Sequence, residues 1–518
     1  MMNRRAWAVI AAYALLALIF VPVYPHFPSP NEFSRWVLAA ALAEDRAVEV
    51  TRFAAILGPR FEDLAEREGR FYSNKAPGLA LISLPGYAAA RLFTGPPSAQ
   101  NLRPVVTAMR IVGATLPLLL LAILFLRLGA AYVINRGRIA FVVWLLLFAT
   151  PLFTYGLLLF SHALVAATLF AAWAMLFGPR VSMGRDITAG VLIGLAVLSE
   201  YPAAIPASVL VLALLLMRAW RRVALVIAGG APLAATMALY HYAAFGSPVR
   251  FPTQFDRLPE YRTLAHTAFL GIGVPSPANL GRLLFDPGKG LFVFAPVLII
   301  ALIALASVRH RLPRASWITL IAVPAALLLV HTGYPNWHGG WTTGPRYILP
   351  VVPFLLFALL FRAPSLIESV AAGWSAAAVI VTTIVFPFVP NAFPLPWGTL
   401  ALPLLGEGLL APNLLHLVAR PLAIVVPLIL IAGAVVAASD RKTLILALAG
   451  VLVAMATGVI ALRSGDPVLR LQRAYIAEVY FEQPGAIERA LPGVLSQQPR
   501  LAQRRASELA LPPVSWPF

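Results

Sequence analysis

The stretch from Ser29 to Gly78 begins with the sequence SPNEFSR and ends with RFYSNKAPG, and it follows the first long apolar run of the chain. It carries acids, arginines and Lys75, one of only three lysines. Most of the remaining sequence is apolar and typical of helices that lie in lipid. A polar loop of this length in such surroundings is the natural place to look for functional residues.

The composition places the chain among membrane proteins. Of its 518 residues, 60% are hydrophobic and 12% are charged, and the mean hydropathy is +0.83. Soluble domains carry about 25% charged residues. Runs of roughly 17 to 25 apolar residues, the length that crosses a bilayer as a helix, recur throughout the chain. Because the backbone must be satisfied within each segment in lipid, and the alternating pattern of a membrane barrel is missing, we expect an all-α polytopic membrane protein.

The net charge of +19 comes almost entirely from arginine. These arginines stand singly or in small groups between apolar runs, where they set topology, and this argues against nucleic acid as a partner. The chain has no cysteine, which excludes disulfides, thiolate metal sites and a cysteine nucleophile. The first apolar run follows Arg4 and Arg5, is too long for a signal peptide and lacks a small-residue cleavage site, so we expect a retained span.

The arginine-bearing loops predict about thirteen spans, with the Ser29–Gly78 loop and the C-terminal tail on the extracytoplasmic side. The first extracytoplasmic loop, residues 26–103, is expected to hold two juxtamembrane helices, at 33–45 and 76–93. Residues 1–462 form the predicted transmembrane catalytic domain, and residues 463–518 the tail, with a helix at 467–481 and little structure beyond it. The spans are expected at about 6–25, 104–126, 139–156, 162–178, 187–200, 202–217, 223–243, 291–308, 315–331, 347–361, 366–386, 415–438 and 443–462.

Glu32 is the first candidate for chemistry. A carboxylate at the mouth of a membrane cavity, partly desolvated and near cations, can take a proton from an acceptor hydroxyl. The spacing Ser29-x-x-Glu32, with Pro30 at the first helical position, is equally typical of a capping box that starts a helix. Both interpretations stay open, and one residue can do both.

Lys75 and Arg346 are candidate phosphate contacts. The compact ammonium of a lysine suits a point contact, and a guanidinium forks onto phosphate with two hydrogen bonds. An ordinary interfacial lysine is the alternative for Lys75, and an aromatic belt is the alternative for the loop around Arg346.

Three histidines are expected on the same side of the membrane: His162, His331 and His338. With Glu32 they could bind a divalent metal, but no metal-binding spacing joins them, and polar groups at the bilayer surface are the better explanation. Asp256, in the second large outer loop, is a candidate acceptor contact.

These motifs resemble a known family. The element Asn31-Glu32-x-x-Arg35, followed by Lys75-Ala76-Pro77-Gly78, resembles the Asp-Glu-x-x-Arg and Lys-Pro-Pro elements in the first outer loop of the GT-C glycosyltransferases. Within that superfamily it is similar to the family 39-like group of protein O-mannosyltransferases and lipid A aminoarabinose transferases. The likeness covers roughly residues 6–362 and includes Gly344-Pro345-Arg346-Tyr347. It departs at two positions, since Asn31 replaces the first acid and Asn74 the acid that can precede the lysine.

The resemblance implies an inverting transferase of a bacterial inner membrane. It would move a sugar from a polyprenyl-phosphate donor to the hydroxyl of a lipid, glycan or protein acceptor on the extracytoplasmic side. By position, Glu32 would be the loop acid and Lys75 and Arg346 the donor-phosphate contacts, to which we add Arg35. No cofactor is certain, and a divalent metal is left open. The residues expected in acceptor or auxiliary roles are Asn31, Tyr72, His162, Asp256, His338 and Tyr347.

Two other classes compete with this hypothesis. A transporter or lipid flippase typically shows paired, interrupted helices in two related halves, with ionisable groups at the midplane. Here the polar residues gather in the outer loops and no clear repeat is visible. The other competitor is a non-catalytic membrane scaffold that binds a partner through the tail.

Overall fold

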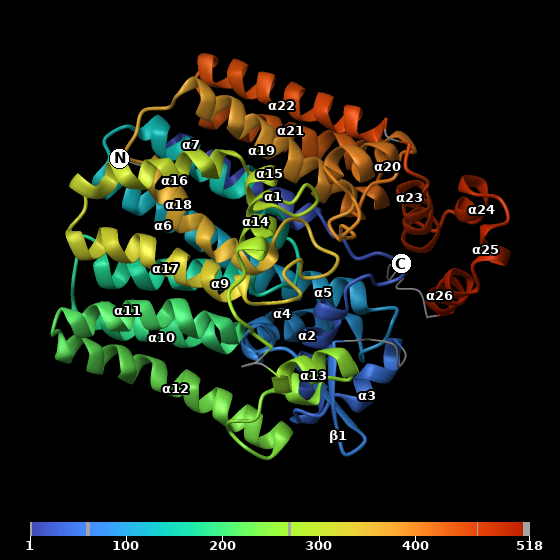
Figure 1. Cartoon of the computed structure of the whole chain (residues 1–518), viewed down its shortest axis with the longest axis horizontal. Helices are drawn as coiled ribbons and strands as arrows, with labels where there is room; N and C mark the ends of the chain where they lie inside the picture. The colour runs from blue at the N-terminus through green and yellow to red at the C-terminus, as the bar shows by residue number, and fades with distance from the viewer. Residues whose placement is uncertain (1–2, 58–62, 268–270, 464, 511–518) are drawn as a thin grey trace.

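The computed structural model describes residues 3–57, 63–267, 271–463 and 465–510, and these residues are mostly helical (Figure 1). Within this part of the chain, six helices are long and apolar enough to cross a membrane. The chain is an all-α membrane protein apart from one short hairpin. The six are Leu102–Tyr132 (α5 to α6), α12 (Trp220–Phe245), α17 (Arg314–Thr332), α19 (Leu366–Val385), α21 (Arg420–Ala438) and α22 (Arg441–Leu462).

Shorter helices fill the remaining predicted spans. Every predicted span overlaps a helix, so the helical assignment is confirmed, while the count of thirteen crossings stays a prediction. These helices are α1 (Arg4–Ile19), α7 (Arg136–Phe148), α8 (Leu152–Tyr155), α9 (His162–Phe177), α10 (Met183–Ser199), α11 (Ala204–Leu216), α15 (Leu291–Phe294), α16 (Val297–Ser307) and α18 (Val352–Leu359). Helix α20 (Leu402–Gly406) lies outside the predicted spans.

The arginine-bearing ends of several helices lie together. The side chain of Asn3, at the N-terminus, donates to the carbonyl of Arg136 at 2.8 Å. Arg138, on the same turn, forms a buried ion pair with Glu368 at 2.5 Å. The N-terminus lies at the left of Figure 1, whereas α2, α13 and β1 gather toward the opposite ends of the helices. The chain therefore has one arginine-rich end and one end that carries the polar loops.

The first polar loop folds around a helix and a hairpin. It contains α2 (Pro30–Ala40), α3 (Thr51–Ala54), β1 (Leu64–Arg67), β2 (Arg70–Ser73) and α4 (Gly78–Thr94). The two expected juxtamembrane helices correspond to α2 and α4. The antiparallel hairpin was not predicted. Its two-residue turn, Glu68 and Gly69, has φ values of 55° and 74°, the positive values that tight hairpins need.

The second polar loop is attached to this hairpin. It contains α13 (Pro259–Thr267) and α14 (Pro277–Phe285). Asp256 forms an isolated antiparallel bridge with Ala65 of β1, and the backbone N–H of Arg257 donates to the carbonyl of Leu64 at 2.9 Å. Residues far apart in the chain are thereby joined by backbone bonds.

The tail is more ordered than expected. The predicted helix is present as α23 (Pro467–Tyr480), but α24 (Ala486–Ala490), α25 (Val494–Gln497) and α26 (Pro499–Leu509) follow where little structure was expected. Arg505 of α26 pairs with the buried carboxylate of Glu478 on α23 at 2.5 Å. The prediction of a poorly ordered tail was wrong because this ion pair fastens its polar last helix to α23.

Helices α19 and α22 pack through small residues. A Cβ atom at Gly450 of α22 would overlap the backbone carbonyl of Val370 on α19, and one at Gly373 would overlap the carbonyl of Ala447. Such contacts let two backbones approach closely in lipid. By contrast, a Cβ at Gly433 of α21 would meet no atom within 4 Å.

We expect Gly450→Ala to lower the thermal stability of the detergent-purified protein, because α19 and α22 must separate to admit a methyl group. The cost of such overpacking is about 1–3 kcal/mol. Gly433→Ala is the matched control and should be neutral or slightly stabilising, since alanine favours helix. Equal melting temperatures for the two variants would contradict this packing.

Candidate functional site

Two adjoining cavities lie among the polar loops. The larger has a volume of about 310 Å³, and the smaller about 140 Å³. The larger cavity is bordered by the start of α2, the turn between β2 and α4, the second polar loop, the loop before Arg346 and helix α26. Seven residues line both cavities: Asn31, Asn74, Lys75, Thr253, Tyr334, Arg346 and Tyr347.

Lys75 and Arg346 meet at this shared wall, although they come from distant parts of the chain. Lys75 follows β2, and its Nζ lies 3.0 Å from a carboxylate oxygen of Asp63. Arg346 begins the 3-10 turn Arg346–Val351 and donates to the Tyr347 hydroxyl at 3.1 Å. Its guanidinium lies over the Phe160 ring, 5.3 Å from the centroid, and its Nε is buried without a hydrogen-bond partner among the described residues. The wall therefore presents two cations from opposite halves of the sequence.

Lys289 fixes the loop that leads to Arg346. Its buried ammonium donates to the backbone carbonyls of Thr342 at 2.5 Å, Val389 at 2.7 Å and Gly340 at 3.1 Å. Burial, with a smaller effect from Arg346, lowers the pKa of Lys289 well below its usual value. The sequence analysis gave this lysine no role. The feature of the sequence that could have indicated a role is a lysine between two glycines, directly before an apolar run.

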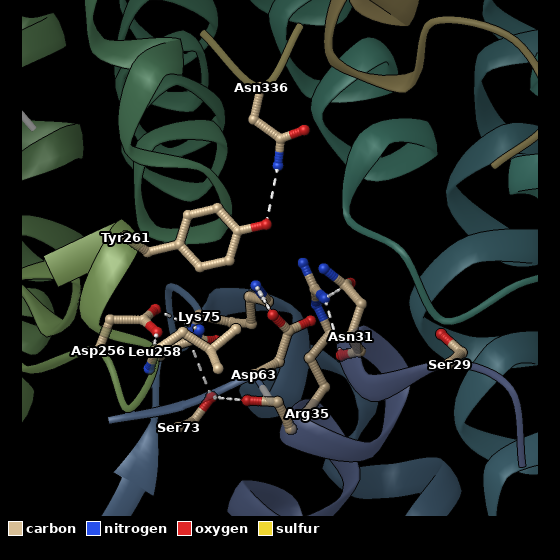
Figure 2. Close-up of polar contacts among 12 residues, drawn as sticks. Ser29, Asn31, Arg35, Asp63, Ser73, Lys75, Asp256, Leu258, Tyr261 and Asn336 are labelled. Atoms are coloured by element: carbon tan, nitrogen blue, oxygen red, sulfur yellow. Dashed lines mark hydrogen bonds and ion pairs between the residues drawn. The ribbon is translucent and has the colours of Figure 1, made fainter. Parts of the chain in front are cut away.

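Two aspartates face the larger cavity. Asp63 lies beside Lys75, and Figure 2 shows both pointing toward one space, with Tyr261 across it. Burial alone would raise the pKa of Asp63, but the ammonium of Lys75 outweighs it, so this pKa is lowered and the carboxylate is charged at neutral pH. Asp256 is more enclosed and accepts from Asn74 at 2.9 Å, and burial raises its pKa. Asp63 is a site residue that the sequence analysis missed.

Glu32 does not lie at the cavity mouth, where the sequence suggested it. Its side chain is 0% exposed, and its two oxygens each accept from the Arg110 guanidinium at 2.8 Å. The backbone N–H of Leu159 adds a third bond at 2.6 Å. The backbone N–H of Glu32 donates to the capping Ser29 hydroxyl at 3.3 Å, so the helix-start interpretation describes this residue better. Its catalytic role stays a prediction.

Arg35 also belongs to neither cavity lining. It donates to Asn31, to the Ser161 hydroxyl at 3.0 Å and to Glu200 at 3.3 Å. Burial lowers its pKa to about 10, and nearby Glu200 partly offsets that effect. Arg35 thus holds Asn31 in place at the shared wall, and its expected contact with a phosphate is untested.

The other predicted residues divide into two groups. Asn31, Asp256 and Tyr347 line the larger cavity, and His162 lines the smaller one. Tyr72 packs against Phe245 with ring centroids 5.6 Å apart, and it lines neither.

His338 also lies off both linings. It accepts from the backbone N–H of Gly340 at 2.9 Å, and burial, followed by the charge of Lys289, lowers its pKa. Within the described residues, no three His, Asp or Glu side chains are grouped so as to hold a metal.

Comparison with known proteins gives only structural likenesses. No family model matches the sequence, and no curated protein matches it. ArnT from Cupriavidus metallidurans bound to undecaprenyl phosphate is 16% identical and has a TM-score of 0.48, with 92% of this chain and 81% of that chain covered. The archaeal oligosaccharyltransferase AglB from Archaeoglobus fulgidus, in complex with an inhibitory peptide and a dolichol-phosphate, is 13% identical with a TM-score of 0.42. That match covers 86% of this chain and 56% of AglB. At such low scores we draw no residue role or substrate from either.

We expect Glu32→Gln to lower the stability of the protein by about 3 kcal/mol, because the buried Arg110 loses its counter-charge. Asp45→Asn is the control, since Asp45 pairs with the exposed Arg52 and such surface pairs contribute about 1 kcal/mol or less. Thermal unfolding of the purified variants measures both effects. An unchanged melting temperature together with lost turnover would instead support Glu32 as the catalytic base.

Proposed function

We propose that the chain is an integral-membrane glycosyltransferase that takes a sugar from a polyprenyl-phosphate donor and transfers it, with inversion, to an acceptor hydroxyl. The observation that carries the proposal is the shared cavity wall, where Lys75 and Arg346 face the same space. Two fixed cations in a partly desolvated cavity suit a phosphate that gains negative charge as the sugar leaves. The motif resemblance in the first loop supports the same function.

The apolar surroundings suit a lipid-linked donor. Helices long enough to cross a membrane lie next to the polar loops, so an isoprenoid chain can stay in the bilayer while its phosphate reaches the cavity. The aromatic rings of Phe160, Tyr334 and Tyr347 on the lining offer surfaces on which a sugar ring can pack. We assign this chemistry to residues 1–462, with the tail of residues 463–518 beside it.

We further propose that the cavity opens on the extracytoplasmic side of a bacterial inner membrane. The support is the arginine-rich opposite end, formed by the N-terminus and the start of α7, which carries Arg136 and Arg138. Arginine is enriched in cytoplasmic loops of membrane proteins.

We expect Lys75→Ala and Arg346→Ala each to weaken the binding of a short-chain polyprenyl phosphate roughly ten- to a hundredfold. Each removes a charge-assisted contact of about 1.5–3 kcal/mol. Lys442→Ala is the matched control, because this third lysine is exposed at the start of α22. Titration of the purified protein measures the affinity, and turnover with a polyprenyl-phosphate sugar completes the test. A wild-type protein that binds polyprenyl phosphate no better than polyprenol would contradict the function.

The absence of cysteine allows a direct test of sidedness. Single substitutions Glu66→Cys, on the exposed side of β1, and Arg180→Cys, in the loop after α9, place one thiol at each end. In intact spheroplasts, a membrane-impermeant maleimide should label the first and leave the second unlabelled until the membrane is opened. The reverse pattern would place the cavity in the cytoplasm.

A further inference from the structure

The proposed transfer needs a group that accepts the proton of the acceptor hydroxyl, and the loop motif does not supply one. Asn31 lines the cavity, but an amide cannot serve as a base at neutral pH. Glu32 is enclosed by Arg110 and Leu159 and lines neither cavity. The base must therefore come from another part of the described structure.

Four carboxylates line the cavities: Asp63, Glu200, Asp256 and Glu508. Glu200 lines the smaller cavity and is held by Arg35 and Ser161. Glu508 lies on α26 in the tail and lines only the larger cavity, so it does not belong to the shared wall.

The two aspartates differ in their exposure and in their partners. Asp256 is 4% exposed, and its two oxygens accept from Asn74 at 2.9 Å and from the backbone N–H of Leu258 at 3.0 Å. The Asp63 side chain is 25% exposed and forms its ion pair with Lys75, the residue assigned to the donor phosphate. Asp63 is thus the carboxylate that is both ionised and next to the phosphate contact.

We propose that Asp63 is the catalytic base, and that the donor phosphate releases it by drawing the Lys75 ammonium out of the Asp63–Lys75 ion pair. This inference rests on the proposed function. In the structure, Lys75 forms an ion pair with Asp63 at 3.0 Å (Figure 2). A bound phosphodiester competes for the same ammonium with its own negative charge. The released carboxylate then faces the cavity, where an acceptor hydroxyl can approach it.

The chemical step balances without a further reactant. The acceptor O–H proton passes to the Asp63 carboxylate, and the acceptor oxygen forms a bond to the anomeric carbon of the donor sugar. The bond between that carbon and the phosphate oxygen breaks, and the electron pair leaves with the phosphate. The products are the glycosylated acceptor, protonated Asp63 and a polyprenyl phosphate, whose added charge Lys75 and Arg346 stabilise. Asp63 returns its proton to solvent.

Release from Lys75 also makes Asp63 a better base. A carboxylate that a nearby ammonium stabilises is a weak base, and its pKa rises when that cation moves toward another anion. General bases work best when their pKa approaches the working pH. The exchange of partners therefore links proton removal to the presence of the donor, which limits deprotonation in a cavity that holds acceptor alone.

The test compares Asp63→Asn with Glu66→Gln, an exposed acid on the same hairpin. Turnover with a polyprenyl-phosphate sugar should fall roughly 10²- to 10⁴-fold in Asp63→Asn, the range for loss of a general base. Glu66→Gln should match the wild type. The affinity of Asp63→Asn for polyprenyl phosphate should be unchanged or higher, because Lys75 has lost its competing partner. A merely structural role would weaken binding and turnover together.

Asp63→Glu provides a second measurement that does not depend on the behaviour of the asparagine variant. Because a base acts only when ionised, turnover falls as the pH drops through its pKa, and a glutamate should move this acid limb toward higher pH. An Asp63→Asn protein with near-normal turnover, or an acid limb that Asp63→Glu leaves in place, would overturn the inference while the transferase function stands. A wild-type protein that transfers no sugar would overturn both.

Discussion

The buried ion pair between Glu32 and Arg110 fixes the start of α2, the helix whose first turn borders the larger cavity. A carboxylate and a guanidinium, each 3% exposed or less, are costly to bury unless their hydrogen bonds are satisfied, and here the carboxylate receives three. This pair joins the start of α2 to α5, and the bond from Leu159 adds the turn before α9. One helical turn later, Arg35 ties Asn31 to Ser161 and Glu200. The polar face of α2 is therefore directed into the protein, and its first turn borders the cavity.

The larger cavity carries opposite charges side by side. Lys75 pairs with Asp63 at 3.0 Å, and Lys289 holds the loop before Arg346 through the carbonyls of Gly340 and Thr342. Of the three lysines in the chain, Lys75 lines the cavity, Lys289 holds the loop before Arg346, and Lys442 is exposed. Only Lys289 of the three is buried, and its compact ammonium bonds backbone carbonyls where the other buried cations, such as Arg35 and Arg110, are guanidinium groups.

Much of the fold could be predicted from the sequence, because long apolar runs and arginine-bearing loops are local signals. The helices at α2 and α4 were equally accessible, since the Ser29 cap and Pro30 mark the start of the first. The burial of Glu32 could not be predicted, because its partner Arg110 lies in another helix and no short-range pattern connects the two residues. That Lys75 and Arg346 lie near each other was predicted from the family resemblance and the topology. No local pattern in the sequence indicates the cavity that the two residues line.

Asp63 was not predicted as a site residue, for a different reason. It precedes the short hairpin Leu64 to Ser73, whose clearest marker in the sequence is the Glu68-Gly69 turn. The expected apolar alternation of a strand is weak in that segment, so the turn alone did not indicate pairing. Only the hairpin brings Asp63 back beside Lys75. The tail was underestimated for a similar reason, because its last helix is polar and depends on the single buried partner of Arg505.

The position of α26 has a practical consequence for handling the protein. Arg504 of this helix lies over the ring of Trp341, 5.8 Å from the centroid, and both line the larger cavity. An affinity tag or fluorescent fusion joined after this helix would start within reach of the cavity and crowd its entrance. A label on the other terminus would sit at the arginine-rich end (Figure 1).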